Sequence, residues 1–197
     1  MINTATLQAS FNRPVYRPVP LVGSRDIIPY LKRNGYTTLA VDLNNTLMNQ
    51  QQGIVRASKG RLKISDFATW DVDLSDKMGM TREAYLTWAW KNAYSELLSE
   101  PFPGATQAMT AIKRAGIQVW IVSATVMSAA NIRGWLGCAG IPFDKVIRTG
   151  DKRGVGDCLI DDSPMTCKAF YDEGLPILRF ELAWNRHLSQ VKGVKWQ

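Results

Sequence analysis

The segment that most constrains the fold runs from Thr37 to Leu47. Its apolar, β-favouring run, Leu39 to Val41, ends directly on Asp42, and a short polar turn follows. A buried strand that ends on a carboxylate places that carboxylate at the carboxyl edge of a sheet, where ligands bind in open α/β sheets. The segment therefore predicts a buried strand with a functional carboxylate at its end.

The rest of the chain alternates between strand and helix patterns. A helix is predicted from Ser24, as a plausible N-cap, to a stop at Gly35. The later pattern predicts helices over about 104–114, 128–136 and 164–171, and strands over about 118–122, 145–148, 158–160 and 177–180. This alternation indicates an α/β fold, a three-layer, Rossmann-type parallel sheet with helices on both faces.

The chain divides into three parts by composition. We expect the proline-containing residues 1–23 to form an N-terminal arm. We expect the core domain to consist of two segments, residues 24–47 and 102–197. Residues 48–101 predict an insertion directly after the first strand, which ends in a helix over about 81–99. The final residues, 181–197, are expected to form a loop and tail.

Composition favours a globular cytoplasmic protein with no membrane contact. No stretch of the 197 residues approaches the roughly 18 consecutive apolar residues of a membrane helix, and no signal peptide is evident. Cys138, Cys158 and Cys167 lack metal-binding spacing, which favours reduced thiols, and the single histidine, His187, argues against a histidine-rich metal site. The net charge of +7 favours anionic ligands in general. It does not distinguish a small phosphate ester from a nucleic acid.

Polar side chains fall at or just beyond the predicted strand ends. Asp42, Ser123 and the pair Asp161 and Asp162 each follow an apolar run directly, and Lys152 lies in the turn after a short strand. Any one of these residues alone would more often be a helix cap, a turn residue or a surface lysine. Their order on successive parallel strands instead predicts that they converge at one sheet edge.

These motifs resemble those of the haloacid dehalogenase-like (HAD) phosphotransferases. The sequence DLNNT matches their first motif, DxDGT, except that Asn44 stands at the second Asp. The segments SELLSEPFPGATQAM and IRTGDKRGVGDCLIDDSP are more narrowly similar to the 5′(3′)-deoxyribonucleotidases, and the resemblance extends over residues 37–187. It implies a small helical cap formed by residues 48–101.

The resemblance implies a phosphomonoesterase that works through an aspartyl-phosphate on Asp42. A carboxylate nucleophile beside other carboxylates needs a hard cation, so we expect Mg²⁺ as the cofactor. The predicted metal ligands are Asp42, the main-chain carbonyl of Asn44, and one or both of Asp161 and Asp162. The predicted phosphate-binding groups are Lys152, the Ser123 hydroxyl and the amide of Ala124.

The same resemblance places a nucleoside monophosphate under the cap. Phe67 and Trp70 are the candidates for packing against its base, although these two residues, with Trp88 and Trp90, are equally well explained as hydrophobic core of the cap. A second possibility is a phosphatase for nucleic-acid ends, which the basic run Arg56, Lys59, Arg61 and Lys63 would suit.

Asn44 is the departure that matters for activity. An Asn side chain neither protonates a leaving ester oxygen nor deprotonates water, and general acid–base catalysis is worth about 10²–10⁴-fold. Three interpretations follow. The protein is a slow phosphatase, a phosphate-binding protein without turnover, or an engineered variant. The predicted function is a Mg²⁺-dependent nucleotidase-type phosphomonoesterase, with the nucleic-acid-end phosphatase and the impaired nucleotide-binding protein as alternatives.

Overall fold

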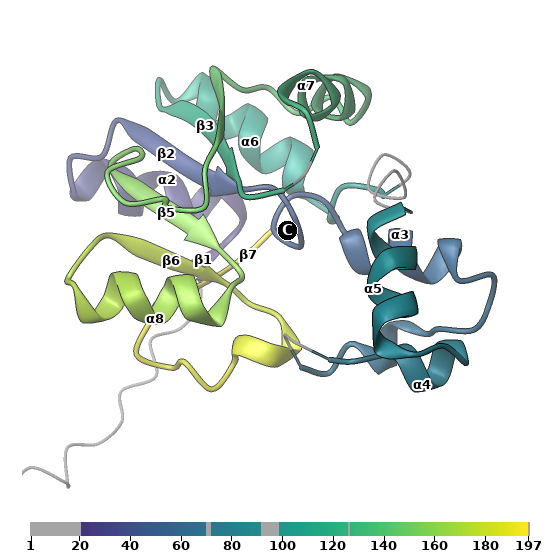
Figure 1. Cartoon of the computed structure of the whole chain (residues 1–197). Coiled ribbons are helices and arrows are strands. Elements are labelled where there is room, and N and C mark those ends of the chain that lie inside the picture. The colour runs from purple at the N-terminus through teal and green to yellow at the C-terminus, as the bar shows by residue number, and fades with distance from the viewer. Residues whose placement is uncertain (1–20, 70–71, 92–98, 126, 197) are drawn as a thin grey trace, which may run out of the picture.

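A seven-stranded parallel sheet organises the computed structural model, which describes residues 21–69, 72–91, 99–125 and 127–196 (Figure 1). The sheet has the order β1-β7-β6-β5-β2-β3-β4. Its strands are β1 (Leu21–Val22), β2 (Thr38–Asp42), β3 (Gln118–Ser123), β4 (Lys145–Arg148), β5 (Cys158–Asp161), β6 (Ile177–Phe180) and β7 (Gly193–Lys195). In the central part, Val41 of β2 pairs with Ile121 of β3 and Ile160 of β5. The strand that ends on Asp42 is thus flanked on both sides.

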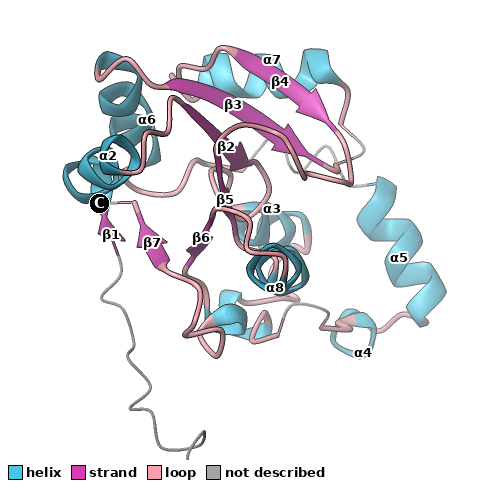
Figure 2. Cartoon of the chain, turned by 90° about the vertical axis from the view of Figure 1, so that its left-hand side faces the viewer, coloured by secondary structure: helices cyan, strands magenta, loops and turns pink. Residues whose placement is uncertain are grey.

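Helices cover both faces of the sheet, which confirms the predicted three-layer α/β fold. Leu39 and Val41 point to one face, where α2 (Gly23–Arg33), α6 (Ala105–Arg114) and α7 (Ala129–Cys138) pack. Ala40 points to the other face, against α8 (Pro164–Asp172). This alternation is the period of two expected of a buried strand. Figure 2 shows the twisted sheet between these layers.

The insertion after β2 forms a small helical group beside the sheet. It contains α3 (Gln50–Ala57), a short 3₁₀ turn (Ile64–Asp66), α4 (Ser75–Met78) and α5 (Arg82–Lys91). It has a hydrophobic cluster of its own, with Leu62, Leu74, Met78 and Tyr85 buried. Both views place α4 and α5 away from the sheet (Figures 1 and 2). The expected helix over 81–99 is described as far as Lys91, and residues 92–98 lie outside the described part of the chain.

Two local predictions from the sequence are wrong. Ser24 is not the N-cap of α2: the helix begins at Gly23, and the Asp26 carboxylate accepts the main-chain N–H of Val22 at 2.8 Å. The segment 181–197 is not only a loop and tail, since β7 pairs with β6 and β1 there and a 3₁₀ turn covers Ala183–Asn185. A three-residue strand that begins with glycine has no apolar run to reveal it. None of the described helices is long and apolar enough to cross a membrane.

Candidate functional site

Three buried carboxylates meet at the carboxyl edge of the sheet. Asp42 ends β2 and Asp161 ends the neighbouring strand β5, with Asp162 next in sequence. One oxygen from each carboxylate lies within 4.8 Å of the others, and the three residues are only 6%, 1% and 0% exposed. The convergence predicted from successive strand ends is therefore present in the geometry.

Lys152 joins two of these carboxylates. Its Nζ donates to Asp42 Oδ1 at 2.5 Å and to Asp161 Oδ2 at 2.7 Å, and the lysine is itself buried. The other oxygen of Asp161 accepts the main-chain N–H of Ser163 at 2.8 Å. Lys152 is therefore not the solvent-exposed lysine that its sequence context alone would suggest.

Asp162 is held by side chains from distant parts of the chain. Its Oδ1 accepts a hydrogen bond from Thr46 Oγ1 at 3.2 Å. Its main-chain oxygen accepts from Asn185 Nδ2 at 2.8 Å and from Trp184 Nε1 at 3.2 Å. Asp162 Oδ2 is buried and has no hydrogen-bond partner among the described residues. A buried carboxylate oxygen without a partner is costly and indicates a missing cation or proton.

Burial and mutual repulsion determine how these groups titrate. Desolvation raises the pKa of Asp42 to about 7, although the Lys152 ammonium opposes the rise. Desolvation, with the Asp42 and Asp161 charges, raises the pKa of Asp162 well above 3.8. Burial alone would lower the pKa of Lys152, but the Asp42 and Asp161 carboxylates raise it overall. Three carboxylates face one ammonium, so the fully ionised site carries excess negative charge that a divalent cation would neutralise.

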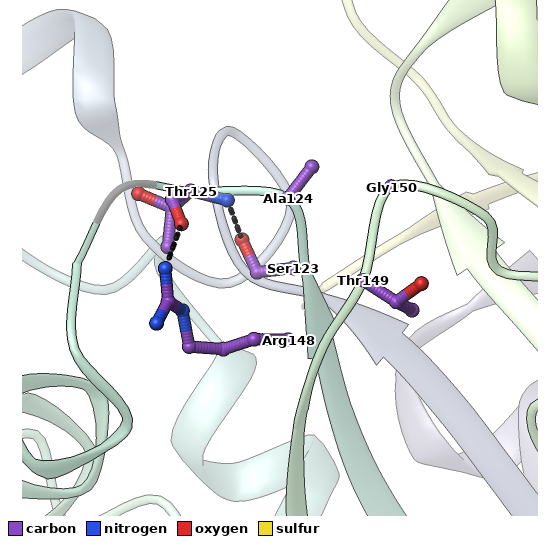
Figure 3. A pocket seen from close by; sticks show the side chains of 6 residues that line it. All are labelled: Ser123, Ala124, Thr125, Arg148, Thr149 and Gly150. Atoms are coloured by element: carbon purple, nitrogen blue, oxygen red, sulfur yellow. Dashed lines mark hydrogen bonds between the residues drawn. The ribbon is translucent and has the colours of Figure 1, made fainter.

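A hydrogen-bonded chain links the loop after β3 to Asn44. The main-chain N–H of Thr125 donates to Ser123 Oγ at 3.1 Å, as Figure 3 shows. Ser123 Oγ in turn donates to Asn44 Oδ1 at 3.0 Å. Asn44 Nδ2 is buried and has no hydrogen-bond partner among the described residues. The amide oxygen is therefore already occupied, and the amide nitrogen is a buried donor.

A cavity of about 340 Å³ opens between the loops that follow β3 and β4 (Figure 3). The Arg148 guanidinium donates to the Thr125 carbonyl at 3.4 Å beside it. The cavity is lined by Ser123, Ala124, Thr125, Arg148, Thr149 and Gly150. This lining is mostly polar, and it includes Ser123 and Ala124, both predicted to bind phosphate.

Phe67, one of the two predicted base-packing residues, does not line this cavity. Phe67 packs against the hydrophobic cluster of the insertion, and Trp88 stacks on Tyr85 with ring centroids 6.1 Å apart. Trp70 lies outside the described residues, and nothing is described of the side chain of Trp90. The alternative explanation, cap core, therefore accounts for Phe67 and Trp88.

The sequence did not predict the residues that hydrogen-bond to Asp162 and hold it in the acidic cluster. Thr46, Trp184 and Asn185 contact Asp162, and Trp196 Nε1 donates to the Thr46 carbonyl at 2.6 Å. Thr46 lies within the DLNNT segment, so its position was an available signal. The other three come from a segment without periodic pattern, and only the fold brings them to the site.

The residues present fit a bound divalent cation. The donor set is oxygen only, which hard divalent cations prefer over the nitrogen and sulfur ligands typical of Zn²⁺. Asp42, Asp161 and the unpartnered oxygen of Asp162 would hold the ion, with the main-chain carbonyl of Asn44 as a further predicted ligand.

Comparison with known proteins places this arrangement in a structural class. The sequence matches no family model and no curated protein sequence. Solved structures do match. A haloacid dehalogenase-like family hydrolase from Streptococcus pneumoniae has a TM-score of 0.57 at 11% identity, over 82% of this chain and 94% of the other. The chain has a haloacid dehalogenase-like fold.

Two further similar structures give the same result. CbbY from Rhodobacter sphaeroides in complex with phosphate has a TM-score of 0.54 at 14% identity, over 81% of this chain and 93% of the other. A predicted phosphoglycolate phosphatase from Haemophilus somnus has the same TM-score and identity, over 81% and 94%. None of the three proteins described here is named a nucleotidase, so the narrower resemblance to that family stays a prediction.

We predict that Mg²⁺ stabilises the chain and that this effect grows with pH. The pKa values of Asp42 and Asp162 are raised, so these two groups bind more protons in the folded, metal-free chain than in the unfolded chain above pH 3.8. The stability that these two groups contribute should therefore fall as the pH rises toward about 7, and Mg²⁺ should restore more of it at about pH 8 than at about pH 5. Thermal unfolding with and without Mg²⁺ measures both effects.

The double variant Asp161→Ala, Asp162→Ala should lose the Mg²⁺-dependent rise in Tm. The matched control is Asp151→Ala, Asp172→Ala, which removes the same charge from side chains that are 64% and 52% exposed. The control should respond to Mg²⁺ as the parent does. A double variant at 161 and 162 that binds Mg²⁺ as well as the parent would exclude this site.

Proposed function

We propose that this protein is a Mg²⁺-dependent phosphomonoesterase that forms an acyl phosphate on Asp42. The observation that carries the proposal is the position of Asp42: it ends β2, contacts Lys152 at 2.5 Å and lies in one cluster with Asp161 and Asp162. A nucleophilic carboxylate, a phosphate-binding cation and a hard-metal site are the groups that phosphoryl transfer needs. The haloacid dehalogenase-like fold and the phosphate in the CbbY complex are consistent with this proposal.

Each residue has a distinct part in the proposed reaction. The Asp42 carboxylate attacks phosphorus in line with the leaving oxygen. Lys152 neutralises charge on the nucleophile and on one phosphate oxygen. The Ala124 amide donates to another oxygen, while the Ser123 hydroxyl donates to Asn44 Oδ1. Bound Mg²⁺ would supply charge neutralisation between the carboxylates and the phosphate. The cavity beside Ser123 offers space for the remainder of a small ester.

Nucleoside monophosphates are the first substrate class that we propose, because of the sequence resemblance around Lys152 and Asp161. A nucleic-acid end is the weaker proposal, since two members of the basic run are used within the fold. Arg56 forms an ion pair with Glu100 at 2.6 Å, and Arg61 donates to the Met78 carbonyl at 3.1 Å. Those two side chains contribute less to a phosphate backbone than the sequence suggests.

A second candidate function is a phosphate-binding protein without turnover, and Asn44 is the observation that favours it. The amide holds Ser123 by a hydrogen bond but has no titratable proton. Such a protein would keep the metal and phosphate contacts and lose only the proton transfers.

A phosphate-release screen tests the proposal. We expect Mg²⁺-dependent release from at least one of three ester types: nucleoside 5′- and 3′-monophosphates, sugar phosphates, and an aryl phosphate. Asp42→Asn is the negative control, because its amide cannot act as the nucleophile. Mg²⁺-dependent binding of phosphate with no release from any ester would favour the binding protein. Release that persists in Asp42→Asn would overturn the assignment of the nucleophile.

A further inference from the structure

Asn44 affects the two halves of the proposed reaction unequally. When the Asp42 oxygen attacks an aryl phosphate, the new O–P bond forms while the P–O bond to the aryl group breaks. The electron pair leaves with the phenolate, which needs no proton from the protein. In the second half, a water oxygen forms a bond to phosphorus, the electron pair of the breaking bond returns to Asp42, and the water must lose a proton to a base.

The geometry around Asn44 hinders that second half specifically. Its Oδ1 already accepts the Ser123 hydroxyl at 3.0 Å, and the same hydroxyl accepts the N–H of Thr125. The free side of the amide is Nδ2, which is buried and lacks a partner among the described residues. An amide N–H group only donates hydrogen bonds, so this side of Asn44 cannot take a proton from the attacking water.

The neighbouring carboxylates are committed to other contacts. Both oxygens of Asp161 accept hydrogen bonds, from Lys152 and from the main chain of Ser163. Asp162 is fully buried, with one oxygen on Thr46 and the other in the predicted metal set. Both carboxylates therefore have other roles in the proposed site, so neither replaces the missing base.

We propose that the phosphoryl group accumulates on Asp42, so that the chain is a long-lived aspartyl-phosphate protein. The inference rests on the proposed function, because Asp42 must first accept a phosphoryl group from an ester. It adds that the loss of that group to water is the slow step. Compared with the same site carrying a carboxylate at position 44, hydrolysis should be slower by about the general-base factor of 10²–10⁴.

The experiment mixes the full chain and Mg²⁺ with p-nitrophenyl phosphate. We expect a burst of nitrophenolate close to one equivalent of protein, followed by a slow phase, and an intact mass increased by one phosphoryl group. Hydroxylamine, which attacks the acyl carbon and releases phosphate, should replace the phosphoryl mass with the smaller mass of a hydroxamate on Asp42 and so identify an acyl phosphate. Asp42→Asn should show neither burst nor added mass, and Asn44→Asp should turn over without accumulating the phosphorylated form.

The outcomes separate this inference from the proposed function. Steady release of nitrophenolate and phosphate in equal amounts, with no burst and no added mass, would overturn the inference and leave the phosphomonoesterase intact. Absence of nitrophenolate from both the parent and Asn44→Asp, with both chains folded and binding Mg²⁺, would overturn the proposed function itself. Added mass that resists hydroxylamine would place the phosphoryl group on a hydroxyl and contradict the assignment to Asp42.

Discussion

The substitution Asn44→Asp should raise the turnover of nucleoside monophosphates by about 10²–10⁴-fold, the usual value of general acid–base catalysis. A sugar alkoxide is a poor leaving group and needs a proton as it departs. A carboxylic acid at position 44 would supply that proton and then take one from water. It would also retain an acceptor for the Ser123 hydroxyl, which now donates to Asn44 Oδ1. Release from aryl phosphates should gain less in the first half-reaction, because phenolate leaves unprotonated.

Asn45→Asp is the matched control for this prediction. It adds the same charge one residue away, in the same turn, and Asn45 already has a positive φ of 55°, which Asp also tolerates. Its Nδ2 faces Gln50 rather than Ser123. The control should leave kcat for nucleotides near the parent value. If Asn44→Asp gains nothing on any phosphomonoester while Mg²⁺ still binds, the site lacks more than an acid, and the phosphate-binding protein becomes the better description.

The strands and their polar ends were predictable because each carries a local signal. Apolar runs before Asp42, Ser123 and Asp161 identify strands β2, β3 and β5, and a parallel sheet brings their carboxyl ends together by geometry alone. In the structure, β2 pairs with both β3 and β5, so their polar carboxyl ends do lie at one edge of the sheet.

The supporting contacts were not predictable because they join segments with no common pattern. Trp196 stacks on Phe180, with centroids 5.5 Å apart, and also holds the carbonyl of Thr46. Asn185 contacts Asp162 from a 3₁₀ turn whose sequence, Ala183–Asn185, has no periodicity. The double role of Lys152, one ammonium between two carboxylates, likewise depends on distances that only the folded chain sets. The role of the aromatic residues in the insertion could not be predicted either, because the same residue types occur in a hydrophobic core and in a surface that binds a base.

The substitution Lys152→Met should destabilise the metal-free chain by about 3–5 kcal/mol, the usual cost of removing one partner of a buried ion pair. Methionine preserves most of the apolar stem but leaves the Asp42 and Asp161 carboxylates, which now accept hydrogen bonds at 2.5 and 2.7 Å, without their common donor. Denaturant unfolding in the absence of Mg²⁺ measures this loss. Phosphate release should fall as well, because the same ammonium neutralises the phosphate oxygen in the proposed reaction.

The pH dependence distinguishes electrostatic destabilisation from a packing defect. Without the ammonium, the pKa of Asp42 should rise further above its present value of about 7. The folded chain then binds more protons than the unfolded chain over a wider range, so the loss should be largest near about pH 8 and should shrink toward about pH 5. Mg²⁺ should recover more stability in the variant than in the parent, since it replaces the missing positive charge.

Lys168→Met provides the control, because Lys168 is 63% exposed and pairs with Asp172 within one helix. Exposed pairs of this kind contribute about 0.3–0.5 kcal/mol, so the control should unfold almost as the parent does. A loss in Lys152→Met that is equal at both pH values would indicate altered packing instead of uncompensated charge. A Lys152→Met variant as stable as the parent at about pH 8 without metal would mean that the carboxylates bind protons in its place. The excess negative charge that makes this edge a cation site would then be absent at the pH where Mg²⁺ is expected to bind.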